Sequence, residues 1–296
     1  MKNNVEKLAK WIMTVFAVVA VAAVFSITVY MIAIGTPALT KVGVIELLFG
    51  TEWTPTASEP AFGIFYVILT SVVGTIAALL IGVPVGVLTS VFIAEVGNKK
   101  IASVVQPAVE LLAAIPSVIY GLVGVMILKP MMYKLEMVVF ANNPTHQFTG
   151  GSNLMSAIIV LAVMILPTVI NISTSSIRAV QKSIRSASLA LGATKIQTIF
   201  KVILPAAKSG IMTAVVLGLG RALGEAMAIN MVAGGVVNLP LPFNSVRFLT
   251  TAIVSEMSYS EGLHRQVLFS LGLVLFAFIL FTNMFLTRII KKGEAE

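Results

Sequence analysis

Two opposite charges lie inside an otherwise apolar stretch and are the residues of this sequence best suited to chemistry. Arg221 and Glu225 are four positions apart, so they would share a face of a continuous helix. Each would cost about 2.5 to 3.5 kcal/mol at the middle of a bilayer, so both must face protein or water. A guanidinium in such a place can bind an oxyanion, with the carboxylate holding it in position or competing for it. The alternative is a buried ion pair that joins two helices.

Small residues surround these two charges. Gly218, Gly220 and Gly224 share the segment with Arg221. Glycines remove side-chain bulk from a membrane helix, so they predict the close approach of a neighbouring helix or of a substrate.

The residues that most catalytic classes need are missing. The sequence contains no cysteine, so it offers neither a disulfide framework nor a thiolate. It has no His-Glu-x-x-His zinc motif and no Gly-x4-Gly-Lys-Ser/Thr phosphate-binding loop. Both histidines lie in segments that read as loops, where a lone histidine is expected to be solvated. We therefore expect no metal, no cofactor and no enzymatic activity in this chain, and an energy source in a partner or an ion gradient.

Composition indicates an all-α polytopic membrane protein. Of 296 residues, 58% are hydrophobic and only 11% are charged, whereas soluble domains have about a quarter charged. Apolar runs long enough to cross a bilayer predict six transmembrane helices. Their approximate ranges are 11–34, 63–94, 104–128, 154–177, 210–237 and 267–290.

The distribution of basic residues predicts the orientation of these helices. With six spans, fourteen of the twenty Lys and Arg residues fall on the side of the two termini, and one, Arg221, lies within a span. The other side has five, namely Lys41, Lys129, Lys134, Arg247 and Arg265. The positive-inside rule therefore places both termini and the basic segment 178–208 in the cytoplasm. The net charge of +8 follows from this bias and from attraction to anionic lipid, so no nucleic-acid partner is expected.

Segment 178–208 also has the pattern of a docking element. Thr194 and Gln197 have the spacing of a capping box, after a turn at Gly192. Apolar residues recur at helical spacing and predict a single stripe formed by Ile196, Ile199, Phe200 and Ile203. Pro205 is expected to end or kink this helix. Such an element lies along a membrane surface or docks on a partner.

The same segment resembles the cytoplasmic signature of the binding-protein-dependent ABC importer permeases, E-A-A-x3-G-x9-I-x-L-P. The matching residues are Ser186, Ala187, Ser188, Gly192, and then Val202, Ile203, Leu204 and Pro205. Ser186 stands where the family signature has Glu. The resemblance implies that segment 186–205 forms the coupling helix that contacts the ATPase.

Within this family, GLGRALGEAMAINMVAGG at 218–235 and LLAAIPSVIYGL at 111–122 are similar to PstC-type permeases of phosphate importers. The resemblance implies a type I ABC importer permease fold and a role for Arg221 and Glu225 in phosphate passage. It also implies a heterodimer with a PstA-type permease, two copies of a cytoplasmic ATPase that binds ATP and Mg, and an external phosphate-binding protein.

These observations divide the chain into three expected parts and leave other substrates and energy sources open. An N-terminal transmembrane helix and external loop (1–61) precede the transporter domain (62–290) and a cytoplasmic tail (291–296). Another oxyanion such as molybdate or sulfate is an alternative substrate. A gradient-driven secondary anion transporter is an alternative mechanism, in which Glu225 would carry the proton.

Overall fold

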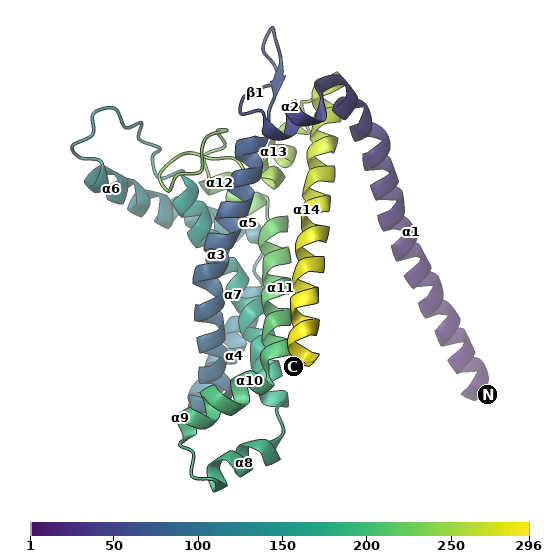
Figure 1. Ribbon diagram of the computed structural model, residues 1–296, viewed down its shortest axis with the longest axis vertical. Helices are drawn as coiled ribbons and strands as arrows, with labels where there is room; N and C mark the ends of the chain where they lie inside the picture. Colours follow the sequence, from purple (N-terminus) through teal and green to yellow (C-terminus); the bar gives the residue numbers. More distant parts are fainter. Residues whose placement is uncertain (1, 296) are drawn as a thin grey trace.

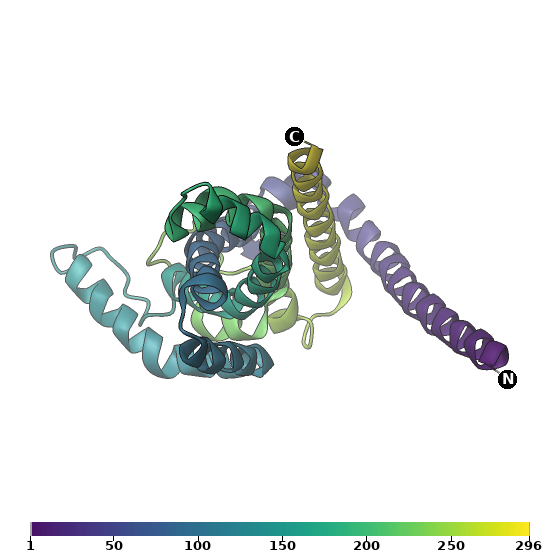
Figure 2. The same cartoon turned by 90° about the horizontal axis from the view of Figure 1, so that it is seen from below.

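The computed structural model describes residues 2–295 as a bundle of long helices from which two helices project in different directions (Figures 1 and 2). Short π-helical turns, named η, interrupt some of the helices. The first half contains α1 (Lys2–Val42), α2 (Val44–Phe49), β1 (Trp53–Thr54), β2 (Ala61–Phe62), α3 (Phe65–Val91), η1 (Phe92–Val96), α4 (Lys99–Ala114), α5 (Ser117–Val123), η2 (Gly124–Leu128) and α6 (Lys129–Val139). The second half contains α7 (Leu154–Ala179), α8 (Lys182–Ala190), α9 (Lys195–Thr198), η3 (Ile199–Ile203), α10 (Leu204–Ala206), α11 (Lys208–Gly224), α12 (Met227–Val232), α13 (Leu249–Glu256) and α14 (Gly262–Ala295).

The prediction of a helical membrane protein is confirmed. In the described part of the chain, five helices are long and apolar enough to cross a bilayer. A sixth span is available if the bent pair Lys195–Ala206 and Lys208–Gly224 counts as one. The tail predicted at 291–296 continues α14 as far as Ala295, and residue 296 lies outside the described residues.

The third predicted span differs from the structure in two ways. It is broken between α4 and α5, where Ile115 has an extended backbone (ψ 127°). The cause is Pro116, whose ring disfavours the helical conformation of the residue before it. The helical chain also continues beyond the predicted end at 128, because residues 129–139 form α6 and the stretch long and apolar enough to cross a bilayer is Ser117–Val139. Helix α6 leaves the bundle sideways (Figure 1).

Helix α7 is the centre of the bundle. In its most apolar stretch 61% of the residues are buried, whereas none is buried in that of α1. α7 packs against α3 and α11 along much of its length. The approach of α3 is close because Gly82 and Gly86 face α7. A Cβ at these positions would lie 2.6 Å from Ile165 Cδ1 and 2.7 Å from Val169 Cγ1.

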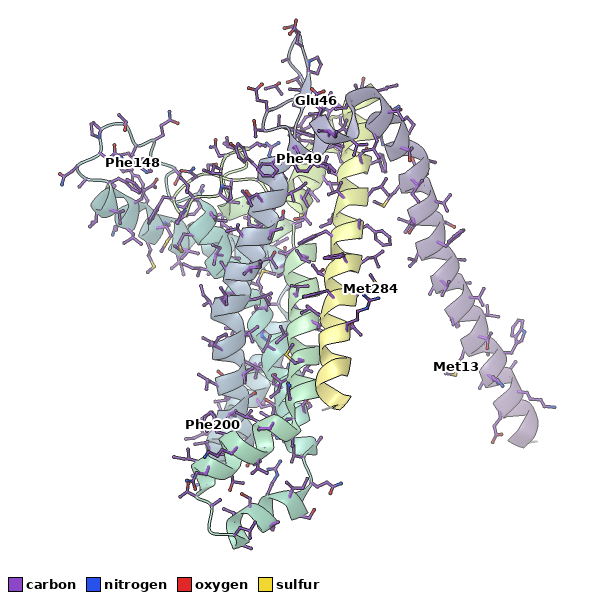
Figure 3. The ribbon with its side chains drawn as sticks, viewed as in Figure 1. Met13, Glu46, Phe49, Phe148, Phe200 and Met284 are labelled. Carbon is purple, nitrogen blue, oxygen red and sulfur yellow. The ribbon has the colours of Figure 1, made fainter. Side chains whose placement is uncertain are left out.

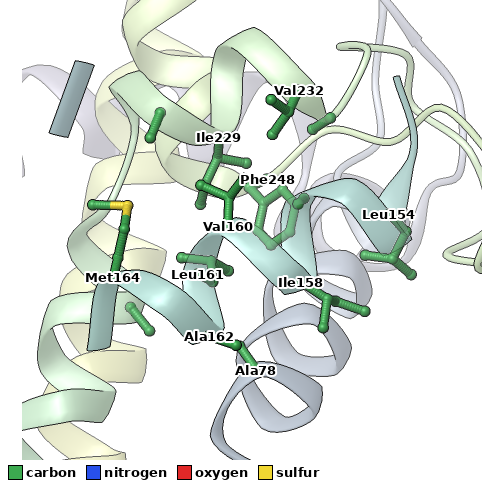
Figure 4. Packing of buried hydrophobic residues seen from close by; sticks show 14 of the residues in the cluster. Ala78, Leu154, Ile158, Val160, Leu161, Ala162, Met164, Ile229, Val232 and Phe248 are labelled. Carbon is green, nitrogen blue, oxygen red and sulfur yellow. The ribbon is translucent and has the colours of Figure 1, made fainter. Parts of the chain in front are cut away.

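The largest apolar cluster forms around the N-terminal half of α7 (Figure 4). Leu161 of α7 is fully buried there with Ala78 of α3 and Ile229 of α12. Phe248, which precedes α13, closes the cluster. The cluster therefore holds together α3, α7, α12 and the segment before α13, which are far apart in the sequence.

A buried glutamate ties together the end of the bundle that carries the β-hairpin. Glu256 forms an ion pair with Arg247 and contacts His264 Nε2 at 2.7 Å. The indole N–H of Trp53 donates to both carboxylate oxygens at 3.1 Å. The expectation that the histidines are solvated was wrong, because His264 is buried and His146 contacts the fully buried Glu136 at 2.9 Å.

Candidate functional site

Arg221 lies in the last turn before a helix break, and Glu225 lies in the break itself. α11 ends at Gly224, and Glu225 is extended, with φ −75° and ψ 128°. A new short helix, α12, begins at Met227. The prediction that one continuous helix covers 210–237, with both charges on one face, was therefore wrong.

The carboxylate of Glu225 stabilises this helix break. Its Oε1 accepts a hydrogen bond from the backbone N–H of Ala228 at 3.0 Å, which satisfies one of the free amides at the start of α12. A negative charge at this position also complements the positive end of the helix dipole. The hydroxyl of Thr250 donates to the Glu225 carbonyl oxygen at 2.6 Å and ties the break to α13. Glu225 is thus held by local contacts.

The guanidinium of Arg221 makes no such contacts among the described residues. The side chain is half-buried in the last turn of α11, where the negative end of the helix dipole favours a cation. Among the described residues it forms no ion pair or hydrogen bond. Arg221 and Glu225 do not form an ion pair with each other. The planar donor fork of Arg221 is therefore available to an oxyanion.

A second broken helix packs against this break. α12 lies against α5, and a Cβ at Gly121 would be 2.7 Å from Met231 Sδ and 2.9 Å from Ala228 Cα. A Cβ at Gly124 would lie 2.8 Å from Val232 Cγ1. The packing role of these two glycines was not predicted, although their three-residue spacing places them on one helix face.

The three glycines around Arg221 differ in their surroundings. A Cβ at Gly218 would lie 3.2 Å from Val169 Cγ2 of α7. Gly220 and Gly224 have no described atom within 4 Å of the place of a Cβ. Gly218 therefore lies against another helix of this chain, whereas a packing role for the other two stays a prediction that needs a surface outside the chain.

The second candidate site is the segment that joins α7 to α11. We call it the basic loop (residues 178–208), and it includes the last residues of α7 and the first residue of α11. Ser186, Ala187 and Ser188 lie in α8, which ends before a turn at Gly192 with φ +84°. Thr194 and Gln197 form the predicted capping box: the Gln197 amide donates to Thr194 Oγ1 at 3.3 Å, and the Thr194 amide donates to Gln197 Oε1 at 2.9 Å. The helical segment extends beyond the exposed Pro205 to Ala206, and the chain then bends by 67° into α11.

The predicted apolar stripe of the basic loop is split between two faces. Ile199 and Ile203 are buried against Val91 of α3 and Ile177 of α7. Ile196 and Phe200 point outward and are 70% and 52% exposed. The prediction of one stripe on a single face was wrong, because α3 and α7 cover only the side of the helix that carries Ile199 and Ile203.

An exposed apolar surface results at the end of the bundle farthest from the hairpin (Figures 1 and 3). Leu191 beside the turn is 89% exposed, and Leu189, Ile196 and Phe200 are each more than half exposed. Ser188 and Thr198 join α8 to α9 through their hydroxyls at 2.9 Å. Apolar side chains held out by a fixed turn and a capped helix can dock on another protein. We call these four apolar residues the docking surface.

No metal centre emerges from the described residues, since no group of three or more His, Asp or Glu side chains is close enough to hold an ion. The arrangement instead offers one unpaired guanidinium at a helix break and one exposed apolar surface.

Comparisons with known proteins point to one family. The family model described as "Binding-protein-dependent transport system inner membrane component" matches residues 82–293. The probable ABC transporter permease protein YqgH of Bacillus subtilis is 39% identical over 292 residues, covering 96% of this chain and 91% of the relative. The phosphate transport system permease protein PstC of Pasteurella multocida is 32% identical over 243 residues, covering 78% of this chain and 75% of the relative.

Solved structures show the same fold at lower identity. The membrane chain of a bacterial alginate ABC transporter in complex with an alginate-bound periplasmic protein matches with a TM-score of 0.66 and 17% identity, covering 95% of this chain and 94% of that chain. The inward-facing MetNI methionine ABC transporter matches with a TM-score of 0.53 and 22% identity, over 78% of this chain and 94% of that chain. With its helical bundle, its basic loop and the family match over residues 82–293, this chain belongs to the binding-protein-dependent transport system inner membrane components, the permeases of ABC importers.

Proposed function

We propose that this chain is the permease subunit of an ATP-driven phosphate importer. The observation that carries the proposal is the guanidinium of Arg221, which has no ion-pair partner among the described residues and lies in the last turn of α11, beside the break that separates α11 from α12. Leaving a cation half-buried is costly unless an anion uses it, and a guanidinium matches the geometry of a phosphate. The PstC relatives support the choice of phosphate over other oxyanions.

The proposed partners follow from the family and from the basic loop. A PstA-type permease would complete the path as a heterodimer, and an extracytoplasmic phosphate-binding protein would deliver the ion. A dimer of cytoplasmic ABC ATPases would bind the docking surface, so ATP and Mg belong to the partner and this chain is non-catalytic. The excess of basic residues supports an orientation in which the basic loop and both termini lie on the inner side of the cytoplasmic membrane.

Transport would proceed by alternating access. Closure of the ATP-bound ATPases would move the two basic loops of the heterodimer and open the outer face toward the binding protein. ATP hydrolysis would return the path to the inward-open state. α11 connects these events within this chain, because it begins directly after the bend that ends the basic loop and carries Arg221 in its last turn.

Uptake of labelled phosphate into proteoliposomes tests this function. The vesicles would contain this chain with its partner permease and ATPase, the binding protein outside and ATP inside. We expect ATP-dependent uptake that Arg221→Gln abolishes and Lys134→Gln, an exposed change in α6, preserves. Normal uptake by Arg221→Gln would refute the anion path.

Two further outcomes of the same assay identify the alternatives. Uptake of sulfate or molybdate in place of phosphate would reassign the substrate. Uptake by this chain alone under a proton gradient would replace the ATP-driven importer by a secondary transporter.

A further inference from the structure

A charged side chain of the basic loop reaches back to the membrane helices. Arg185, in the first half of α8, forms an ion pair with Glu95 in η1, the turn that ends α3. Its other terminal nitrogen donates to the carbonyl oxygen of Ile177 in α7 at 2.6 Å. One guanidinium therefore joins three helical elements.

This contact matters because the other hydrogen bond that anchors α8, between Ser188 and the buried Thr198, leads only to α9 of the same loop. None of its side chains is buried, and its packing is with α9 and η3, which belong to the same loop. Arg185 gives α8 a direct attachment to α3 and α7. The attachment is sheltered, since the side chains of Arg185 and Glu95 are 22% and 11% exposed. A sheltered pair is screened less by salt than a surface pair, so it holds its geometry better.

The geometry of the contact fixes an orientation as well as a distance. A guanidinium is planar, and its two terminal nitrogens bind here to acceptors on different helices. Rotation of α8 would break at least one of these bonds. Glu95 lies in a π-helical turn, a feature that is frequent at functional sites.

A connection leads from this contact to the candidate anion site. Arg185 binds the cytoplasmic-side end of α7 at Ile177, and α7 packs closely against α11 where Val169 meets Gly218. Gly218 is three residues before Arg221 in α11. A shift of α8 that moves α7 would therefore also move α11, the helix that carries Arg221.

We propose that the Arg185–Glu95 pair is a positioning link of the transport cycle. It holds the docking surface at a fixed angle to α3 and α7, so that a movement of the bound ATPase reaches the membrane helices instead of being absorbed by the loop. The proposal rests on the proposed function, because it requires an ATPase on the docking surface.

Charge exchange in the reconstituted importer tests this link. The variants are Glu95→Gln, Arg185→Gln and the double exchange Glu95→Arg with Arg185→Glu, and Lys182→Gln is the matched control in α8. The readouts are co-purification of the ATPase, the rate of ATP hydrolysis and the phosphate transported per ATP hydrolysed.

We expect both single variants to keep the ATPase and to hydrolyse ATP while the phosphate transported per ATP falls about fivefold or more, the lower end of usual coupling effects. The double exchange should recover part of this loss, and Lys182→Gln should behave as the original chain. A transport ratio unchanged in both single variants would overturn the proposal.

A purely structural role is distinguished by a conservative variant. Arg185→Lys keeps the charge opposite Glu95 but lacks the planar fork that reaches Ile177, so we expect normal assembly with a reduced transport ratio. If the single variants lose the ATPase while Arg185→Lys transports with the original ratio, the pair serves assembly only and the proposal is overturned. Failure of the unaltered chain to bind an ATPase would instead refute the proposed function.

Discussion

Replacing Gly192 by alanine tests whether the shape of the basic loop matters for docking. Gly192 has φ +84°, which L-residues avoid at a cost of about 1–2 kcal/mol. A Cβ there would meet no described atom within 4 Å, so the substitution adds backbone strain without a steric clash. The turn would relax to another conformation and displace Leu191 and the capped α9.

This strain energy gives the expected change in the dissociation constant for the ATPase. If docking requires the left-handed turn, the ATPase must restore it on binding, and 1–2 kcal/mol corresponds to a dissociation constant about 5- to 30-fold higher. Gly192→Asn should lose less, because asparagine tolerates positive φ better than alanine. Gly43→Ala is the matched control, since Gly43 has φ +89° with equally open surroundings but lies between α1 and α2.

The assay is a titration of the purified chain, held in nanodiscs with its partner permease, with the ATPase subunit. We expect Gly192→Ala to bind more weakly than Gly192→Asn, and Gly43→Ala to bind as the original chain does. Equal affinity of Gly192→Ala and the original chain would refute the reasoning, as would an equal loss in Gly43→Ala.

Three further changes test the packing and the electrostatics of the bundle. Gly82→Leu should lower the stability of the detergent-solubilised chain by about 1–3 kcal/mol or more through overpacking against Ile165, seen as a lower Tm, and an unchanged Tm would contradict the α3–α7 contact. Glu256→Gln leaves buried partners unpaired and should cost about 3–5 kcal/mol, with a shift of Trp53 fluorescence; unchanged emission would contradict the cluster. Burial, and secondly the charge of Glu256, raise the pKa of the Tyr259 hydroxyl. The protonated hydroxyl therefore contributes to the free energy of unfolding below pH about 10, and this contribution is lost as the pH rises through the raised pKa. Tyr259→Phe should remove that part of the pH dependence of Tm, a small effect because the residue is 62% exposed, and an identical slope would contradict it.

Local signals in the sequence were sufficient for some features and insufficient for others. The apolar spans predicted at 11–34, 63–94, 154–177 and 267–290 and the Thr194 capping box depend on neighbouring residues and were predicted correctly. The spans predicted at 104–128 and 210–237 were wrong, because each is broken. The break at Glu225 was missed because no proline marks it and because a hydroxyl from Thr250, 25 residues away, helps to hold it. Ion pairs such as Arg185–Glu95 join residues 90 positions apart, and no periodicity or motif indicates them.

The roles of the site residues depend on surfaces beyond this chain. Sequence reasoning selected Arg221 and Glu225 from the cost of burying charge, and the structure separates their environments. Glu225 caps α12 through Ala228, whereas Arg221 has no ion-pair partner among the described residues. That difference follows from where a helix ends, which depends on packing between α5 and α12 rather than on spacing.

Labelling and cross-linking of a single cysteine test the central claim most directly. The sequence has no cysteine, so Leu191→Cys introduces one thiol at the most exposed point of the docking surface. A membrane-impermeant thiol reagent should label it in inside-out vesicles and not in intact cells, and a thiol cross-linker should join it to a nucleotide-hydrolysing subunit. Labelling from outside intact cells, or cross-links that never include such a subunit, would contradict the claim that this loop connects a cytoplasmic motor to the anion path.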